Sequence, residues 1–218
     1  GKTALIFISQ SGETKDLHRC IKIGKDYECI MIGVVNEPDS MIAREVHCGC
    51  YLNAGREVAV ASTKSFTNQV ILLSMIAIWF SQHKEVKENK RLQHVNDLRR
   101  LYLDIEKTIK IAETQVDEQL CNLFTHHSCF VLGKGKGEAI AREGSLKIKE
   151  ISYIHSEGYS ASSLKHGPFA LLCKGFPVIL VDVSETHHVK MKNVYEEIKS
   201  RHATTIVITY ESLDNVNN

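Results

Sequence analysis

A lysine between two glutamates forms the clearest acid–base pattern in the sequence. Lys147 lies four residues after Glu143 and three residues before Glu150. Residues at this spacing share one face of a helix, so the three charges should form a row. Many such rows are only exposed ion-pair ladders, but the apolar Ile151 follows directly, which does not fit a fully solvated helix. We therefore interpret Glu150 as a candidate general acid–base, with the Lys147 ammonium as an electrophile beside it.

Two hydroxyl-rich turns are candidates for holding a phosphate group. The first is SQSGET at residues 9–14, which follows an apolar run, and the second is VASTK at residues 60–64. We place both between the end of a strand and the start of a helix. A helix N-terminus offers unpaired N–H groups and a partial positive charge, which suit an anion. One such turn is often a plain helix cap, but two in one unit favour a shared phosphate site. Lys64 is either a phosphate partner or a solvated first-turn residue.

His166 is set beside a rigid turn, in the sequence LKHGP at residues 164–168. Gly-Pro ends regular structure and restricts the backbone, and an imidazole held there can transfer protons near neutral pH. An ordinary surface histidine is the alternative. The adjacent pairs at 126–127 and 187–188 are predicted to be exposed. The HCGC sequence at 47–50 lacks four ligands at zinc-like spacing, so we expect no metal, and we expect no cofactor.

The elements that must position these residues alternate between strand and helix. Apolar runs predict strands, and helical spacing of apolar residues predicts helices between them. This alternation favours an α/β fold in which parallel sheets are covered by helices on both faces. Ligands of such sheets bind at the carboxyl ends of strands. The predicted strands are 4–8, 29–35, 47–52, 129–132, 177–183 and 204–209, and the predicted helices are 13–23, 138–154 and 190–199, with 41–46 ambiguous.

Two longer helices are predicted in the middle of the chain. Residues 61–82 are apolar almost all round, which is typical of a buried helix. Residues 93–123 repeat apolar positions near a period of 3.6, which is typical of an amphipathic helix. We therefore place a first domain at 1–90, a linking helix at 91–120 and a second domain at 121–218.

Taken in order, these motifs resemble the isomerase half of the glutamine–fructose-6-phosphate aminotransferases, which is built from sugar isomerase (SIS) domains. The resemblance rests on the two turns, on EG at 143–144 with LKIKEISYIH at 146–155, and on LKHGP. It implies two SIS domains, each a parallel sheet sandwiched between helices and joined by the long helix, with the first domain incomplete. It also implies amination of fructose 6-phosphate with ammonia from glutamine, followed by isomerisation to glucosamine 6-phosphate.

The resemblance implies a role for each candidate residue. Glu150 would move a proton between C1 and C2 of the sugar, with support from Lys147. His166 would assist ring opening in the neighbouring subunit of a homodimer. The substrate-binding residues, most of them for the sugar phosphate, would be Ser9, Gln10, Ser11, Thr14, Val60 and Ser62.

Several features set expectations about the parent protein. We expect a glutaminase domain in the same parent chain, and we expect the first strand and helix of the first SIS domain and a tail lysine to lie outside this stretch, which alone should not form product. Two alternatives stay open: another SIS enzyme such as a deglycase or deaminase-isomerase, and a non-catalytic SIS sensor of phosphosugars. Four residues depart from the family pattern, namely Arg56, Ala59, Arg142 and Ser145.

Composition excludes other classes of protein. The 218 residues contain 27 Lys and Arg against 26 Asp and Glu, so there is no net basic field to collect the phosphates of a nucleic acid or a membrane surface. No apolar run approaches the roughly 18 residues that would suggest a membrane-spanning helix. The seven cysteines are scattered, which favours reduced thiols in a cytoplasmic protein.

Overall fold

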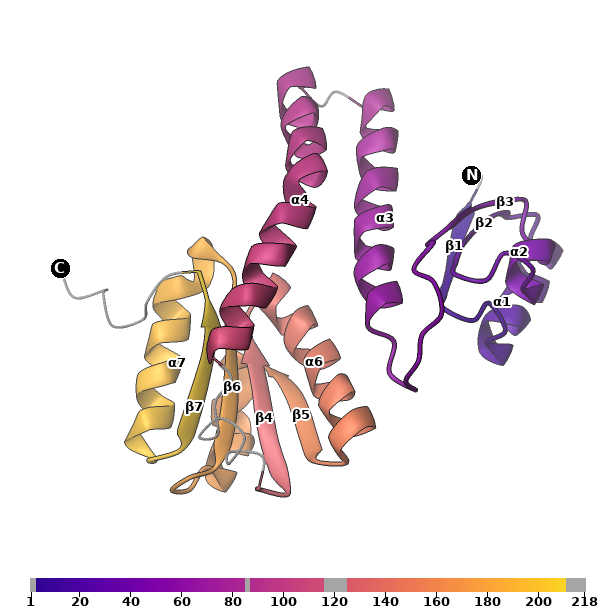
Figure 1. Ribbon diagram of the computed structural model, residues 1–218. Helices are drawn as coiled ribbons and strands as arrows, with labels where there is room; N and C mark the ends of the chain where they lie inside the picture. Colours follow the sequence, from indigo (N-terminus) through magenta and orange to yellow (C-terminus); the bar gives the residue numbers. More distant parts are fainter. Residues whose placement is uncertain (1–2, 85–86, 116–124, 211–218) are drawn as a thin grey trace. The chain divides into compact units, whose positions relative to one another are not determined.

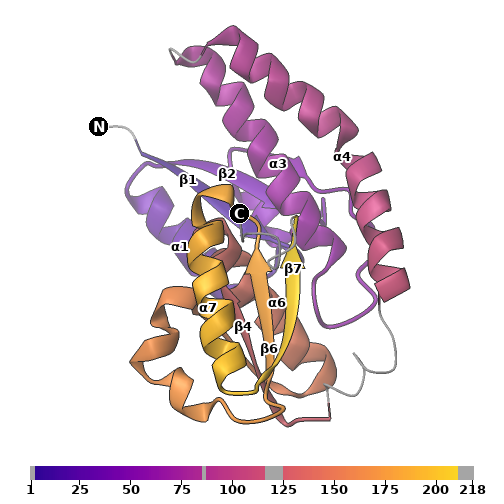
Figure 2. The ribbon, with the colours of Figure 1, turned by 90° about the vertical axis from the view of Figure 1, so that its left-hand side faces the viewer.

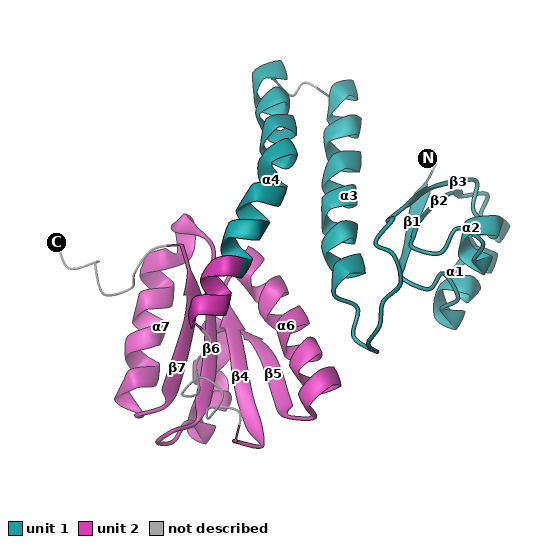
Figure 3. Cartoon of the chain, viewed as in Figure 1, with its two compact units in different colours: residues 1–109 teal, residues 110–218 magenta. Residues whose placement is uncertain are grey.

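The computed structural model describes residues 3–84, 87–115 and 125–210. The chain divides into two compact units, residues 1–109 and 110–218 (Figures 1 and 3). The division falls inside the long helix α4 (Glu88–Gln115). Each unit contains a parallel sheet with helices packed against it, so the expected α/β class is confirmed.

The first unit begins with a three-stranded parallel sheet in the order β1-β2-β3. Its strands are β1 (Ala4–Ser9), β2 (Ile30–Val35) and β3 (Cys48–Tyr51). The connections are α1 (Lys15–Asp26) and α2 (Met41–Glu45), so the ambiguous segment at 41–46 is a short helix. Apolar residues from both helices and both longer strands form one core, which consists of Phe7, Ile21, Met31, Val35 and Ile42.

The helix α3 (Lys64–Phe80) and α4 follow, joined in the described residues by the 3₁₀ helix η1 (Ser81–His83). The prediction that α3 is buried is wrong, since Ser65 is its buried residue while Met75 and Trp79 are more than half exposed. A helix that is apolar all round needs neighbours on every side. Here an apolar pocket of about 420 Å³ lies between α3 and strands β2 and β3, so even the side toward the sheet is not closely packed.

The second unit is a four-stranded parallel sheet in the order β5-β4-β6-β7. Its strands are β4 (Ser128–Gly133), β5 (His155–Ser160), β6 (Pro177–Asp182) and β7 (Thr204–Thr209). The helix α7 (His188–Ser200) lies over β6 and β7 (Figure 2), and α6 (Lys136–Ser152) packs on β4 and β5. Neighbouring residues of β4 belong to different cores, Leu132 to the core with α7 and Val131 to the core with α6, so the two helices cover opposite faces.

Several elements differ from the prediction. Strand β5 was not predicted, because HSEGYS lacks an apolar run; it is stabilised by its parallel pairing with β4. The 3₁₀ helices η2 (Ala161–His166), η3 (Pro168–Leu171) and η4 (Glu185–His187) were also not predicted. The helix predicted at 93–123 is observed from Glu88 to Gln115, and its predicted end at 116–123 lies outside the described residues.

Candidate functional site

The first turn is a compact network of hydroxyl groups at the carboxyl end of β1. Ser9 is buried, with 6% of its surface exposed. Its Oγ accepts a hydrogen bond from the Gly12 N–H at 3.0 Å and lies 3.1 Å from Thr14 Oγ1. Ser11 Oγ accepts a hydrogen bond from the Glu13 N–H at 3.2 Å. Because Ser11 and Thr14 are exposed, the turn presents hydroxyls to solvent at the start of α1.

Gly12 allows this turn to pack against α2. Its φ of 68° lies in the left-handed region that favours glycine. A Cβ at this position would lie 2.0 Å from Ser40 Oγ, and the Gly12 carbonyl accepts a hydrogen bond from the Ile42 N–H at 3.0 Å. The shape of the turn therefore depends on a glycine, for both conformation and space.

The N-terminus of α1 is not capped by the side chain of its N-cap residue. Thr14 occupies the N-cap position, but its hydroxyl makes no capping hydrogen bond. The neighbouring carboxylate of Glu13 accepts a hydrogen bond from the Met41 N–H at 2.7 Å, at the start of α2, where Ser40 is the N-cap. The plain-cap interpretation of this turn is therefore wrong for Thr14. The positive end of the α1 dipole receives neither the Thr14 hydroxyl nor the Glu13 carboxylate.

The second turn differs from the expectation. β3 ends at Tyr51, and residues 52–63 form neither strand nor helix, so the predicted strand end before Val60 is wrong. Within this loop, Glu57 Oε1 accepts hydrogen bonds from the N–H groups of Thr63 and Ser65, both at 2.9 Å, and from Ser65 Oγ at 2.8 Å. The donors of Ser65, followed by that of Thr63, hold the pKa of Glu57 below its usual range. This carboxylate caps α3.

Asn36 links the two turns. It follows β2 directly and is buried. Its backbone N–H donates to the Gln10 carbonyl at 3.2 Å, its Oδ1 accepts from the Ala54 N–H at 3.0 Å, and its Nδ2 donates to the Gly55 carbonyl at 2.8 Å. These bonds fix the start of the loop beside the first turn. Sequence reasoning missed Asn36, although a polar residue directly after a buried strand is a usable signal.

Helix α6 brings the predicted charged row together on one face. Lys147 Nζ lies 2.9 Å from Glu150 Oε2 and 3.3 Å from Glu143 Oε1. The Lys147 side chain is 20% exposed and both carboxylates are 28% exposed, so the row is half-buried rather than fully solvated. Burial disfavours the charged amine, but the hydrogen bonds to Glu150 and Glu143 outweigh it and raise the pKa of Lys147. Lys147 is therefore a fixed positive charge beside Glu150.

His166 is presented to solvent at the end of η2. The following Gly167 has a φ of 144°, a conformation that favours glycine. The neighbouring Lys165 Nζ forms an ion pair with Glu197 Oε1 at 2.7 Å, which links the turn to α7. The turn at residues 164–168 thus presents an exposed imidazole.

The two turns lie in the first unit, and Lys147, Glu150 and His166 lie in the second. The structure connects the two turns through Asn36, and it joins Lys147 to Glu150. Ser62 is half-buried and Val60 is 92% exposed. Lys64 donates to the Arg56 carbonyl at 2.8 Å, so it braces the loop.

Two further expectations need correction or qualification. The pair at 187–188 is not exposed as predicted, because His188 is buried and its Nδ1 lies 2.6 Å from Asp182 Oδ2 at the end of β6. Of the residues that depart from the family pattern on α6, Arg142 pairs with Glu138 at 2.8 Å, whereas Ser145 is buried and its Oγ has no partner among the described residues.

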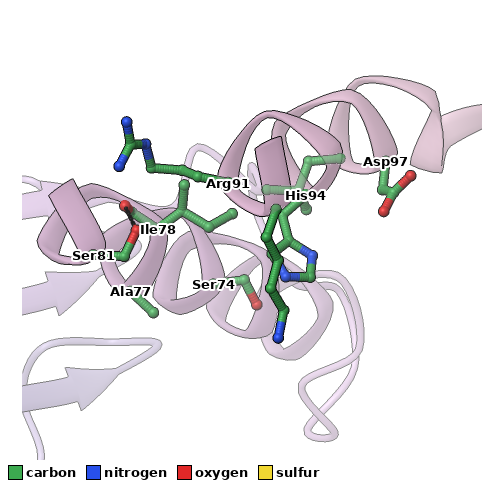
Figure 4. A pocket seen from close by; sticks show the side chains of 9 residues that line it. Ser74, Ala77, Ile78, Ser81, Arg91, His94 and Asp97 are labelled. Carbon is green, nitrogen blue, oxygen red and sulfur yellow. Dashed lines mark hydrogen bonds between the residues drawn. The ribbon is translucent and has the colours of Figure 1, made fainter. Parts of the chain in front are cut away.

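A separate pocket of about 500 Å³ lies between α3 and α4 (Figure 4). It is lined by Ser74, Ala77, Ile78, Ser81, Lys90, Arg91, His94, Asp97 and Leu98, and so contains none of the predicted site residues. Within the described residues, no group of three or more His, Cys, Asp or Glu side chains is placed to hold a metal ion. No described helix is both long enough and apolar enough to cross a membrane.

Comparison with known proteins gives consistent results. The family model described as "SIS domain" matches residues 2–79 and 122–218. The chain is 48% identical over 214 residues to a probable glutamine–fructose-6-phosphate aminotransferase [isomerizing] of Acanthamoeba polyphaga mimivirus, which covers 98% of this chain and 35% of that protein. It is 39% identical to the human glutamine–fructose-6-phosphate aminotransferase [isomerizing] 2, over 93% of this chain and 30% of that protein. The chain thus spans about a third of the length of these relatives.

Solved structures agree. The C-terminal domain of glucosamine-fructose-6-phosphate aminotransferase from Francisella tularensis matches with a TM-score of 0.91 at 30% identity, covering 98% of this chain and 60% of that one. The structure titled glucosamine-6-phosphate deaminase from Thermotoga maritima matches with a TM-score of 0.76 at 24% identity, which shows a shared fold alone. The resemblance inferred from the motifs is therefore confirmed.

Proposed function

Because this chain belongs to the SIS domain family, we propose that it is the isomerase portion of a glutamine–fructose-6-phosphate aminotransferase. In this proposal the chain binds a sugar phosphate and moves a proton between two adjacent carbons. The reaction of the whole protein would form glucosamine 6-phosphate and glutamate from fructose 6-phosphate and glutamine. The observation that carries the proposal is the Lys147–Glu150 pair, half-buried on α6 at 2.9 Å within a motif of that family.

The first turn would hold the phosphate. Its exposed hydroxyls at Ser11 and Thr14 lie at the start of α1, and the Thr14 side chain makes no capping hydrogen bond there. Gln10 and the buried Ser9 complete the turn, while Val60 and Ser62 would contact the substrate from the linked loop. Gripping the phosphate far from the reacting carbons orients those carbons for proton transfer.

Glu150 would carry the proton. A proton that leaves C1 and returns at C2 needs one base that can give back what it takes, and a single carboxylate can do both. The Lys147 ammonium, 2.9 Å from Glu150 Oε2, would stabilise negative charge that develops on the substrate. The isomerisation thus needs no cofactor in this proposal.

His166 would assist sugar ring opening. Its imidazole is exposed on a turn attached to α7, which leaves it available to a neighbouring molecule. We propose that it serves the site of the second subunit in a homodimer, and that a glutaminase domain of the same parent chain supplies ammonia.

The proposal is tested with Glu150→Gln in the complete protein. We expect product formation to fall by about 10²–10⁴-fold, the usual contribution of a general acid–base, while fructose 6-phosphate binding measured by calorimetry stays within about threefold. Glu138→Gln is the matched control, because this carboxylate lies on the same helix but pairs with Arg142. Unchanged turnover in Glu150→Gln would remove Glu150 from the mechanism. A wild-type protein that binds the sugar phosphate without turnover would instead indicate a sensor.

A further inference from the structure

The two turns of the first unit differ in how the N-terminus of the following helix is capped. At α1 the N-cap residue Thr14 makes no capping bond. At α3 a single oxygen, Glu57 Oε1, accepts three hydrogen bonds from Thr63 and Ser65. Ser65 is fully buried, so its N–H and hydroxyl are committed to this internal carboxylate. The helix end that resembles a second anion site is therefore already occupied by the chain itself.

We propose that Glu57 is a positioning residue of the sugar-phosphate site. Its carboxylate takes the place of a bound anion at the N-terminus of α3, so the phosphate is held by the first turn and the second turn presents Val60 and Ser62 to the sugar. This inference rests on the proposed function and refines it, because it explains why the phosphate binds at the first turn and not at the N-terminus of α3.

Three features of the loop support this division. Asn36 fixes its start at Ala54 and Gly55, and Glu57 fixes its end at Thr63, so the segment between is held from both sides. Between these anchors Val58 and Val60 stand out, 93% and 92% exposed. The loop thus directs its carboxylate inward and its apolar side chains outward.

Charge gives a second argument. A phosphate placed at the N-terminus of α3 would compete with the Glu57 carboxylate for the donors of Thr63 and Ser65. Two anions at one set of donors repel each other. At the first turn the Glu13 carboxylate is engaged by the Met41 N–H of α2, so Glu13 does not take the place of a phosphate there.

The test compares two ligands on the complete protein carrying Glu57→Gln. Titrations followed by NMR use fructose 6-phosphate and inorganic phosphate separately. We expect fructose 6-phosphate to bind about tenfold more weakly, because neutralising an acceptor weakens charge-assisted hydrogen bonds, whereas inorganic phosphate loses no more than about twofold. An unchanged affinity for fructose 6-phosphate, or an equal loss for both ligands, would overturn the proposal.

Glu45→Gln is the matched control. This carboxylate also belongs to the first unit and accepts from Lys25 and His18, but it makes no bond to the loop. Amide exchange in the ligand-free protein tests the positioning role of Glu57 separately from the proposed binding of a sugar phosphate. We expect the Thr63 and Ser65 amides to exchange at least about fivefold faster in Glu57→Gln than in wild type or Glu45→Gln, since a weaker cap opens more often. Unchanged exchange would refute the role of Glu57 even if no sugar phosphate binds, whereas a wild-type protein that binds neither ligand would refute the proposed function.

Discussion

At the scale of single residues, the proposed function depends on a hydroxyl that does not cap its helix and on a lysine held in its charged form. Thr14 stands at a helix cap without making a capping bond, and its hydroxyl lies near that of the buried Ser9. Lys147 is held in its charged form between two carboxylates. The row that contains Lys147 was identified from spacing, because i to i+3 and i to i+4 neighbours on a helix are fixed by its geometry. Ser9 and Thr14 were identified from the hydroxyl-rich turn that follows an apolar run.

Thr14→Val removes the hydroxyl while keeping the volume of the side chain. The hydroxyl does not cap α1 but lies 3.1 Å from Ser9 Oγ, so the free energy of unfolding should fall by about 0.5–1.5 kcal/mol, the usual net contribution of one hydrogen bond. Loss of a hydrogen bond to a charged phosphate should cost about 1.5–3 kcal/mol of binding, which is at least tenfold in affinity. Calorimetry with fructose 6-phosphate measures this loss.

Thr108→Val is the control for that substitution, since the Thr108 hydroxyl donates to the Asp104 carbonyl on exposed α4. Each variant loses one side-chain hydrogen bond, so both should melt within about 2–4 °C of the wild type. Equal affinities of Thr14→Val and wild type would remove Thr14 from the phosphate site.

At the scale of elements, the first turn has its shape because α1 and α2 pack through a glycine. Alternating strand and helix predicted most elements correctly, since buried parallel strands show as apolar runs. Pattern reasoning failed where pairing or hydrogen bonds decide the structure. The polar strand β5 forms by pairing with β4, and the loop before α3 is fixed by Asn36 and Glu57 rather than by a strand.

Gly12→Ala tests this packing. An alanine held at a φ of 68° loses about 1–2 kcal/mol, and its Cβ would also meet Ser40 Oγ at 2.0 Å. We expect a total loss of more than about 2 kcal/mol in the free energy of unfolding, together with weaker binding of the sugar phosphate. Denaturant titration measures the stability.

Gly55→Ala isolates the contribution of the clash. Gly55 has the same φ of 68°, but nothing lies within 4 Å of its Cβ position. This variant should lose only the conformational part. If both variants lose the same free energy, the contact with Ser40 is not what requires glycine at position 12.

The stabilising contributions of Glu57 and Lys147 are lost at opposite ends of the pH range. The lowered pKa of Glu57 means that its stabilising contribution is present above its unfolded pKa and is lost as the pH falls through the folded value. The raised pKa of Lys147 means that its contribution is present below its unfolded pKa and is lost as the pH rises through the folded value. Both contributions are complete near neutral pH, so neither group acts as a switch there.

At the scale of the whole molecule, the candidate site residues are divided between the two units. The first unit contains the hydroxyl turns and the second contains the Lys147–Glu150 pair and His166. The predicted domains at 1–90 and 121–218 also assign the two turns to one domain and Lys147, Glu150 and His166 to the other. They could not predict the exposure of α3, because burial depends on which neighbours surround a helix and not on its own composition.

A crystal structure of the complete protein with bound fructose 6-phosphate tests the account most directly. We expect the phosphate within hydrogen-bonding distance of the Ser11 and Thr14 hydroxyls, and the C1 and C2 atoms beside the Glu150 carboxylate. A phosphate bound elsewhere, such as in the pocket between α3 and α4 or at Thr63 and Ser65 in place of Glu57, would contradict the account.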